Sequence, residues 1–365
     1  MKNIPIFDLQ KQYHSLKKEI DQKTIEIYEN SAYINGEECK RFEEDFASYC
    51  GVKHAIGVAS GTAAITLSLQ ALGLGPGDEV ICPSFTFAAT AEAILHVGAT
   101  PVFVEIDPKT YNISPQAIQK VITQKTKAII VVHLYGQMVE MDPIIDVAKK
   151  NDLFVVEDTA QAHGAIYKGK KAGSIGDLGC FSFFPAKNLG CAGDGGGVTT
   201  NSHELNEKVR KLKDHGRVSK YVHESVGYGE RLDNLQAAIL NIKLPHLDEW
   251  NQRRREIASH YTKNLSQTFV TPYIHPDCES VFYTYTLRHK KRDEIIEYLK
   301  SRGISTGIYY PIPLHKQKAF EQYTTSLPVS EEYSDEIFAI PVYPELTGEQ
   351  VEYITNTLNE FVSAK

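Results

Sequence analysis

Short apolar runs alternate with longer amphipathic stretches through the first two thirds of the chain. The strand-like runs are 55–59, 79–82, 101–105, 128–132, 153–157, 179–183 and 197–200. Up to residue 153, each gap between consecutive runs is long enough for the crossover that joins parallel strands. The pattern therefore predicts an α/β fold, with a large, doubly wound and mostly parallel sheet covered by helices on both faces.

The first fifty residues have helical spacing instead. Apolar or aromatic residues recur every three or four positions through 9–29 and again through 39–49, with an Asn35–Gly36 turn between the two stretches. Further on, helical patterns cover 63–72, 204–213 and 233–243. The polar, glycine-punctuated stretch 218–230 is expected to be a loop near the functional site.

Pro245 marks a change in pattern. We expect residues 1–244 to form the large domain and residues 245–365 a smaller C-terminal α+β domain. The second part is predicted to contain helices at 247–265, 293–301 and 348–362, and strands at 281–288 and 304–309.

Composition narrows the class of protein. The chain has 365 residues, is 42% hydrophobic and carries a formal net charge of -7, whereas nucleic-acid binders are more often basic. Its six cysteines lack the short paired spacing of metal or redox sites, and no apolar stretch approaches the length of a membrane span. The N-terminus lacks the apolar core of a secretory signal. These features predict a cytoplasmic protein with reduced thiols, without a metal site and without nucleic-acid or membrane partners.

A single lysine, Lys187, follows the strand-like run 179–183 and precedes a glycine-rich return into the next strand. A neutral lysine amine can attack an aldehyde to form a Schiff base, and burial lowers the amine pKa far enough for this reaction. An ordinary surface lysine in a loop is the alternative. The position between a rigid strand and small residues favours a reactive amine.

Two other features add to this interpretation. Asp158 ends a strand that looks buried on both faces, at the edge where ligands bind in open α/β sheets. A carboxylate there could pair with the protonated pyridine nitrogen of pyridoxal phosphate. Ser60-Gly61-Thr62 joins a strand to a helix and could hold a phosphate at the positive helix end, although the same residues also cap ordinary helices.

These residues belong to a set of six motifs that follow one another in a fixed order along the chain. The motifs are Ser60–Ala64 (SGTAA), Pro83–Thr90 (PSFTFAAT), His133–Gln137 (HLYGQ), Glu157–Ala165 (EDTAQAHGA), Phe181–Asn188 (FSFFPAKN) and Arg231–Ala238 (RLDNLQAA). The chain resembles the DegT/DnrJ/EryC1/StrS family of sugar aminotransferases, which depend on pyridoxal 5'-phosphate (PLP), and the likeness extends from Ile4 to His315. It implies the aspartate-aminotransferase-like fold, fold type I of the PLP enzymes.

The resemblance also implies roles for individual residues. Lys187 would bind the cofactor covalently and later move protons, and Asp158 would pair with the ring nitrogen. The other implied cofactor contacts are Gln161 near the ring's phenolic oxygen, Phe87 against one ring face, and Gly61, Thr62 and Ser182 at the phosphate. Asn234 would reach the phosphate of the cofactor in a neighbouring subunit, since similar enzymes are homodimers with shared active sites.

The reaction implied by the resemblance is ping-pong transamination. L-Glutamate would convert PLP to its pyridoxamine form (PMP), which then aminates a keto group, preferably at C3, of a nucleotide-linked sugar. C4 amination, amination of a keto-cyclitol and a noncatalytic PLP-binding regulator are the alternatives. Some relatives use the cofactor for dehydration and carry histidine in place of the lysine, so Lys187 favours amino transfer.

Two groups of residues are expected near the sugar substrate. His215 and Arg217 lie close to Lys213 and form either a phosphate-binding patch or a solvated face. The segment that holds Tyr309, Tyr310 and His315 resembles that of enzymes that aminate 3-keto sugars, in which a histidine often stands where this chain has Tyr309.

Overall fold

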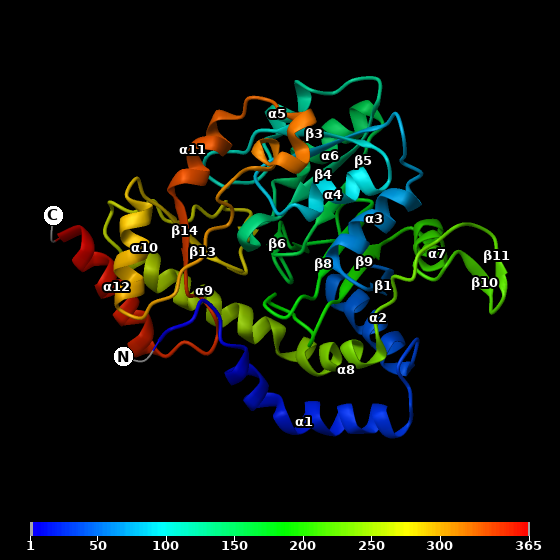
Figure 1. Cartoon of the computed structure of the whole chain (residues 1–365), viewed down its shortest axis with the longest axis horizontal. Coiled ribbons are helices and arrows are strands. Elements are labelled where there is room, and N and C mark those ends of the chain that lie inside the picture. The colour runs from blue at the N-terminus through cyan, green and yellow to red at the C-terminus, as the bar shows by residue number, and fades with distance from the viewer. Residues whose placement is uncertain (1–2, 364–365) are drawn as a thin grey trace.

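A large sheet forms the centre of the molecule. The structure is a computed structural model and describes residues 3–363. The strands of the sheet are β1 (His54–Val58), β2 (Glu79–Pro83), β3 (Thr100–Val104), β4 (Thr126–Val132), β5 (Phe154–Asp158), β8 (Leu178–Ser182) and β9 (Gly196–Thr200). Their order is β1-β9-β8-β5-β4-β2-β3 (Figure 1). Neighbouring strands are parallel, except that β9 is antiparallel to β1 and β8. The predicted mostly parallel sheet is confirmed.

Alternate residues of the strands point into two separate cores. Val80 and Cys82 pack with α3 (Gly61–Ala71), α4 (Ala89–His96) and α7 (His203–Leu212) on one face. Ile81, between them, packs on the other face with α5 (Pro115–Gln119) and α6 (Met141–Asn151). Because successive strand side chains point to opposite faces, a strand that is apolar at every position needs cover on both sides. The helices in the crossovers supply that cover.

The N-terminal helices form a third packed unit. Helix α1 (Leu9–Glu29) coincides with the predicted range, and α2 (Glu37–Cys50) extends its predicted range slightly. The buried face of α2 packs on α8 (Asn234–Lys243) and on Phe181 and Phe183 from the end of β8. These contacts fix the chain on either side of Lys187.

The C-terminal part lies at the left in Figure 1 and has its own core. Its elements are α9 (Leu247–Asn264), α10 (Arg292–Ser301), α11 (Pro328–Glu336), α12 (Gly348–Ser363), β13 (Tyr285–Arg288) and β14 (Ile337–Ile340). Strands β13 and β14 pair antiparallel, and Ile4 from the N-terminal segment joins this core through a bridge to Ile304. A three-stranded sheet, β12 (Cys278–Glu279), β6 (Ile166–Tyr167) and β7 (Lys170–Lys171), includes strands from both parts. The division at residue 245 stays a prediction.

Three sequence expectations need correction. The stretch 304–309 is not a strand but makes isolated bridges at Ile304 and Gly307. The predicted strand 281–288 begins only at Tyr285, because its first amides bond to another loop. The expected loop 218–230 includes part of a small hairpin, β10 (Arg217–Ser219) and β11 (Val222–His223), which projects at the right in Figure 1.

No helix among residues 3–363 is both long and apolar enough to cross a bilayer. Within the same residues, no cluster of three or more His, Cys, Asp or Glu side chains could hold a metal ion. All six cysteines are buried and unpaired, as expected for packing residues.

Candidate active site

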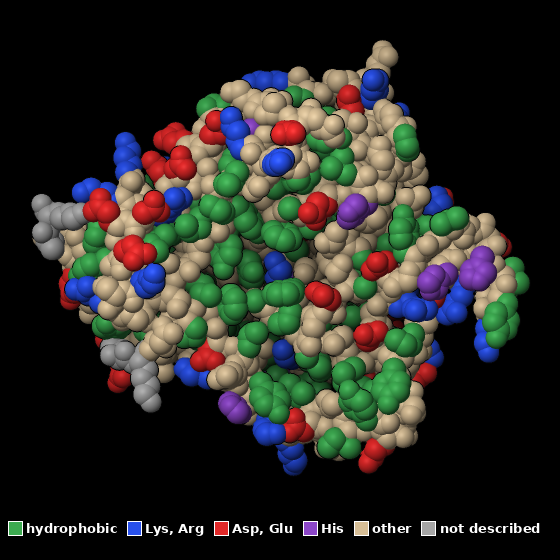
Figure 2. All heavy atoms as spheres, in the orientation of Figure 1, with side chains coloured by type: hydrophobic (Ala, Val, Ile, Leu, Met, Phe, Trp, Pro, Cys, Tyr) green, Lys and Arg blue, Asp and Glu red, His purple; other side chains and the backbone are tan. Residues whose placement is uncertain are grey.

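A cavity of about 490 Å³ lies at the carboxyl ends of the central strands. It is bounded by the ends of β4, β5 and β8, by the start of α3 and by segments of the C-terminal part. Its lining includes Ser60, Gly61, Thr62, Thr86, Phe87, Asp158, Gln161, Ser182, Phe184, Lys187, Asp194, Tyr283, Tyr309 and Tyr310. Figure 2 shows hydrophobic side chains gathered around the centre of this face. Strand ends and helix starts meet at this edge of the sheet, which is where parallel α/β folds bind ligands.

Lys187 stands in the turn after β8. Its backbone amide donates to the Phe184 carbonyl at 2.9 Å, and its Nζ lies 4.4 Å from the centre of the Tyr283 ring. Burial lowers the pKa of Lys187 to about 8, and the negative charge of Asp158 partly opposes that shift. A substantial fraction of the amine is therefore neutral and nucleophilic near physiological pH.

Selective acetylation of the cofactor-free protein is expected to reveal this pKa. A protonated amine does not react, so the labelling rate of Lys187 should rise with pH and level off above about pH 8. Lys243 has a pKa lowered to a similar value, about 8, but its Nζ is buried and donates to the Gly190 carbonyl at 2.7 Å. Peptide mapping by mass spectrometry should find Lys187 labelled early and Lys243 protected. A rate at Lys187 that keeps rising as for a surface lysine, to a pKa of about 10.4, would contradict the lowered pKa.

Asp158 occupies the end of β5 and is buried. One carboxylate oxygen accepts from the Thr90 hydroxyl at 2.8 Å, and the other accepts from the Ala160 amide at 3.2 Å. Burial raises the pKa of Asp158, and these two hydrogen bonds oppose the rise. A buried carboxylate that faces a cavity without a close ion pair can accept a cationic donor from a ligand.

The start of α3 forms the third wall of the cavity. The Ser60 hydroxyl accepts from the Ala63 amide at 3.0 Å, which caps the helix. A Cβ atom at Gly61 would lie 2.7 Å from Cβ of Ser182, so only glycine fits there. The first amides of a helix have no intrahelical acceptor and, with the positive end of the helix dipole, are available to bind an anion. A phosphate cradle, a buried carboxylate and a low-pKa amine together fit pyridoxal phosphate.

Gln161 and the aromatic residues complete the cavity. The Oε1 atom of Gln161 accepts from the Tyr135 amide at 2.8 Å, and its Nε2 donates to the Tyr310 hydroxyl at 3.0 Å. Phe87 remains 59% exposed, and its ring centre lies 6.0 Å from that of Tyr310. This exposed aromatic surface is available to stack on a bound ring.

Some predicted site residues lie elsewhere. Asn234 is buried at the start of α8, where its side chain donates to the Ala32 carbonyl and accepts from the Cys39 amide. Arg217 begins strand β10 of the projecting hairpin and pairs with Asp214, and His215 lies just before that strand. None of these residues lines the cavity, so their roles toward a partner subunit or the substrate stay predictions.

His315 is also turned away from the cavity. Its ring is buried, with Nδ1 2.6 Å from the Ser84 hydroxyl and Nε2 3.0 Å from a Glu331 carboxylate oxygen. Both ring nitrogens are occupied, so His315 supports the segment that carries Tyr309 and Tyr310 and does not itself face a ligand. The expected direct contact of His315 with the substrate stays a prediction.

Thr90 and Tyr283 contact the site residues although neither was predicted to do so. Thr90 closes the motif 83–90, and its place in that motif was the available signal. Tyr283 comes from the C-terminal part, and no local pattern could place its ring beside Lys187.

The sequence of this chain is similar to those of known aminotransferases. Residues 14–359 match the sequence profile of the DegT/DnrJ/EryC1/StrS aminotransferase family. The chain is 48% identical, over 98% of its length and 99% of the relative, to a dTDP-3-amino-3,6-dideoxy-alpha-D-galactopyranose transaminase from Aneurinibacillus thermoaerophilus. It is 47% identical, over 98% of both chains, to a "pleiotropic regulatory protein" from Geobacillus stearothermophilus.

Two solved structures of similar proteins have the same fold as this chain. S. venezuelae DesV is 40% identical and superimposes with a TM-score of 0.97, covering 99% of both chains. The Bacillus subtilis protein ntda, solved with bound cofactor PMP, is 29% identical with a TM-score of 0.93, covering all of this chain and 86% of that one. These similarities and the sheet described above confirm the predicted fold class.

Proposed function

Because this chain belongs to the DegT/DnrJ/EryC1/StrS aminotransferase family, we propose that it aminates C3 of a nucleotide-linked keto sugar with L-glutamate as the amino donor. The enzyme is a PLP-dependent sugar aminotransferase. The observation that carries the proposal is the cavity in which Lys187, Asp158 and the start of α3 meet. A homodimer would bring Asn234, His215 and Arg217 to a neighbouring cavity.

Each residue of the cavity is assigned its own role in the reaction. Bound PLP supplies an aldehyde and an electron-accepting ring that stabilises negative charge at the carbon next to the transferred nitrogen. Lys187 provides the amine that holds the cofactor and, once released, carries a proton at Nζ to and from that carbon. Asp158 keeps the ring nitrogen protonated, and the first amides of α3 with Ser182 hold the phosphate.

The position of amination is inferred from relatives. The Aneurinibacillus relative is named for a sugar with its amino group at C3. Tyr309 and Tyr310 line the cavity of this chain, where their side chains are available to contact a sugar. The name of the Geobacillus relative raises a regulatory role as the second candidate, and regulation alone does not explain a low-pKa lysine in a phosphate-binding cavity.

The reverse reaction tests the proposal. The PLP form of the enzyme is mixed with dTDP-linked or UDP-linked sugars that bear an amino group at C3 or at C4, and the shift of the bound cofactor to PMP is followed by visible absorption. We expect conversion by a 3-amino sugar and regeneration of PLP by 2-oxoglutarate. Conversion only by 4-amino sugars would indicate a 4-keto sugar as the substrate, and conversion only by an aminocyclitol would indicate a keto-cyclitol. A protein that binds PLP but converts with no amino compound would support the regulatory candidate.

A further inference from the structure

The motif His133–Gln137 has no part in the proposed chemistry, yet it adjoins the cavity. It follows β4 and forms a short 3-10 helix, η1 (Leu134–Gly136). Inside this turn, Tyr135 adopts a left-handed conformation with φ of 59°, and Gly136 has φ of 96°. A non-glycine residue in this region is sterically disfavoured and persists where its surroundings hold it.

Three hydrogen bonds hold Tyr135, and each leads to a segment that lines the cavity. Its amide donates to Oε1 of Gln161 at 2.8 Å. Its carbonyl accepts from the amide of Tyr283, the residue whose ring lies beside the Lys187 amine, at 3.0 Å. Its hydroxyl donates to the carbonyl of Tyr309. One residue thus connects three walls of the cavity.

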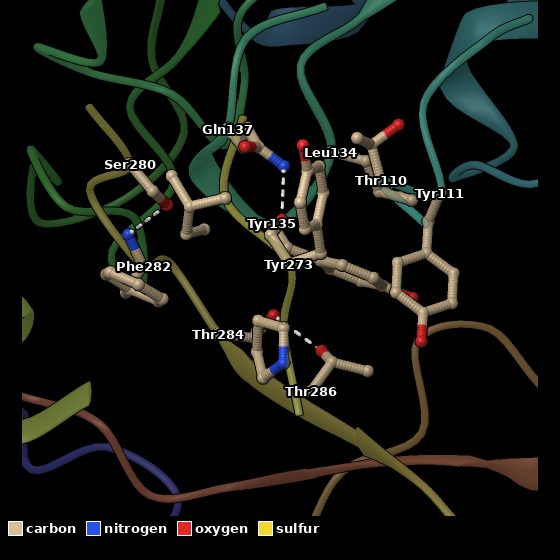
Figure 3. A pocket seen from close by; sticks show the side chains of 12 residues that line it. Thr110, Tyr111, Leu134, Tyr135, Gln137, Tyr273, Ser280, Phe282, Thr284 and Thr286 are labelled. Carbon is tan, nitrogen blue, oxygen red and sulfur yellow. Dashed lines mark hydrogen bonds between the residues drawn. The ribbon is translucent and has the colours of Figure 1, made fainter. Parts of the chain in front are cut away.

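The neighbouring residues join the same turn to the C-terminal part. The Gly136 carbonyl accepts from the Val281 amide at 2.9 Å, and a Cβ atom at Gly136 would lie 2.9 Å from the Phe282 nitrogen. The Gln137 side chain donates to the Tyr273 carbonyl at 3.0 Å. Figure 3 shows residues of both segments around a second, much smaller cavity of about 20 Å³, which has room for about one water molecule.

The side chain and the backbone of Tyr135 act on different walls. The two backbone bonds fix Gln161 and Tyr283, which lie beside Asp158 and Lys187. The hydroxyl makes the hydrogen bond from Tyr135 to the segment of Tyr309 and Tyr310, and the ring packs against the same segment. The other hydrogen bond of that segment at this edge runs from Gln161 to the Tyr310 hydroxyl at 3.0 Å. Removing the hydroxyl therefore takes one hydrogen bond from this wall and leaves the ring packing and the groups around the lysine in place.

From this arrangement we infer that Tyr135 is a positioning residue for the sugar substrate. Its hydroxyl holds the wall of Tyr309 and Tyr310 at the distance from Gln161 that a sugar requires, without touching the reacting atoms. The inference rests on the proposed function, because it assigns that wall to the sugar.

The test compares Tyr135→Phe with Tyr111→Phe in the PLP-loaded enzyme. The Tyr111 ring lies 5.7 Å from that of Tyr135, and its hydroxyl makes no hydrogen bond among residues 3–363, so the control removes the same atom from a neighbouring ring. Three quantities are measured: the single-turnover rate with L-glutamate, KM and kcat for dTDP-3-amino-3,6-dideoxy-α-D-galactose with 2-oxoglutarate, and hydrogen–deuterium exchange of residues 304–314.

For Tyr135→Phe we expect KM for the amino sugar to rise about tenfold, as for one lost hydrogen bond that leaves a carbonyl unpaired. The L-glutamate rate should stay within about twofold, and exchange in 304–314 should increase. Tyr111→Phe should change none of these. Unchanged exchange and KM in Tyr135→Phe would overturn the inference, and so would equal losses in both half-reactions with faster exchange throughout the chain.

Failure of the proposed function gives a different result. If the wild-type enzyme does not convert the amino sugar, the substrate assignment is wrong whatever the variants do. The exchange comparison still decides whether the Tyr135 hydroxyl holds the wall, and unchanged exchange overturns that part independently.

Discussion

Replacing Lys187 by alanine is expected to lower kcat by about 10³–10⁴-fold, the upper part of the range for losing a positioned acid–base group. Among residues 3–363, Lys187 is the only lysine or arginine that lines the cavity, and its amine has a pKa of about 8. No other side chain of the lining can therefore replace it as the amine that holds the cofactor. Steady-state transamination and the visible spectrum of the bound cofactor measure the effect. The phosphate cradle is untouched, so the variant should still bind PLP.

Two comparisons separate the proton-carrying role from a structural one. Lys187→Arg keeps a positive charge but cannot lose its proton near neutral pH, so it should be as inactive as Lys187→Ala. Added methylamine should restore part of the activity of Lys187→Ala, because a small neutral amine fits the space that the side chain vacates. Activity of Lys187→Ala within about tenfold of wild type would refute the assignment, since a missing catalytic base costs more.

Asp158→Asn is expected to lower kcat by about 10²–10⁴-fold, the rate equivalent of the 3–5 kcal/mol lost when a buried ion pair loses one partner. Asparagine has the same shape and can keep the contacts with Thr90 and the Ala160 amide, so cofactor binding should persist. It cannot keep a ring nitrogen protonated, so the ring stabilises negative charge less well. Stopped-flow measurement of the L-glutamate half-reaction checks this outcome.

The stability of the cofactor-free protein supplies the control for Asp158→Asn. Burial raises the pKa of Asp158, which means that the folded state disfavours the charged carboxylate. At neutral pH the charge therefore reduces the free energy of unfolding, and asparagine should increase that free energy in urea denaturation. A variant that is less stable as well as less active would indicate a structural role, and wild-type kcat would exclude the pairing.

Most regular elements were predictable because their signals are local. Helix α1 coincides with its predicted range, and each central strand lies within two residues of its predicted bounds. Buried strands and amphipathic helices carry their periodicity in adjacent residues, so no distant contact is needed to identify them. The stretch 281–284 is an exception. Its alternation is that of a strand, but the amides of Val281 and Tyr283 donate to Gly136 and Tyr135.

The residues of the cavity also differ in whether the sequence alone could identify them. Lys187, Asp158 and Ser60-Gly61-Thr62 were identified from the sequence because each stands at the junction of a strand with a turn or helix. Tyr283 and Tyr135 were not, because their relation to the lysine depends on contacts between residues far apart in the sequence. His315 shows the converse, since its residue type fits a ligand contact but its ring is used by Ser84 and Glu331.

The sequence by itself determined the fold class, the family resemblance and the side chains able to do the chemistry, since these follow from periodicity and from motifs of adjacent residues. Only the tertiary structure decided which of those side chains share one cavity. It also set the amine of Lys187 to a pKa of about 8, because desolvation depends on every segment that surrounds the group. The wall of Tyr309 and Tyr310 is positioned by the packing of the C-terminal part against the large sheet.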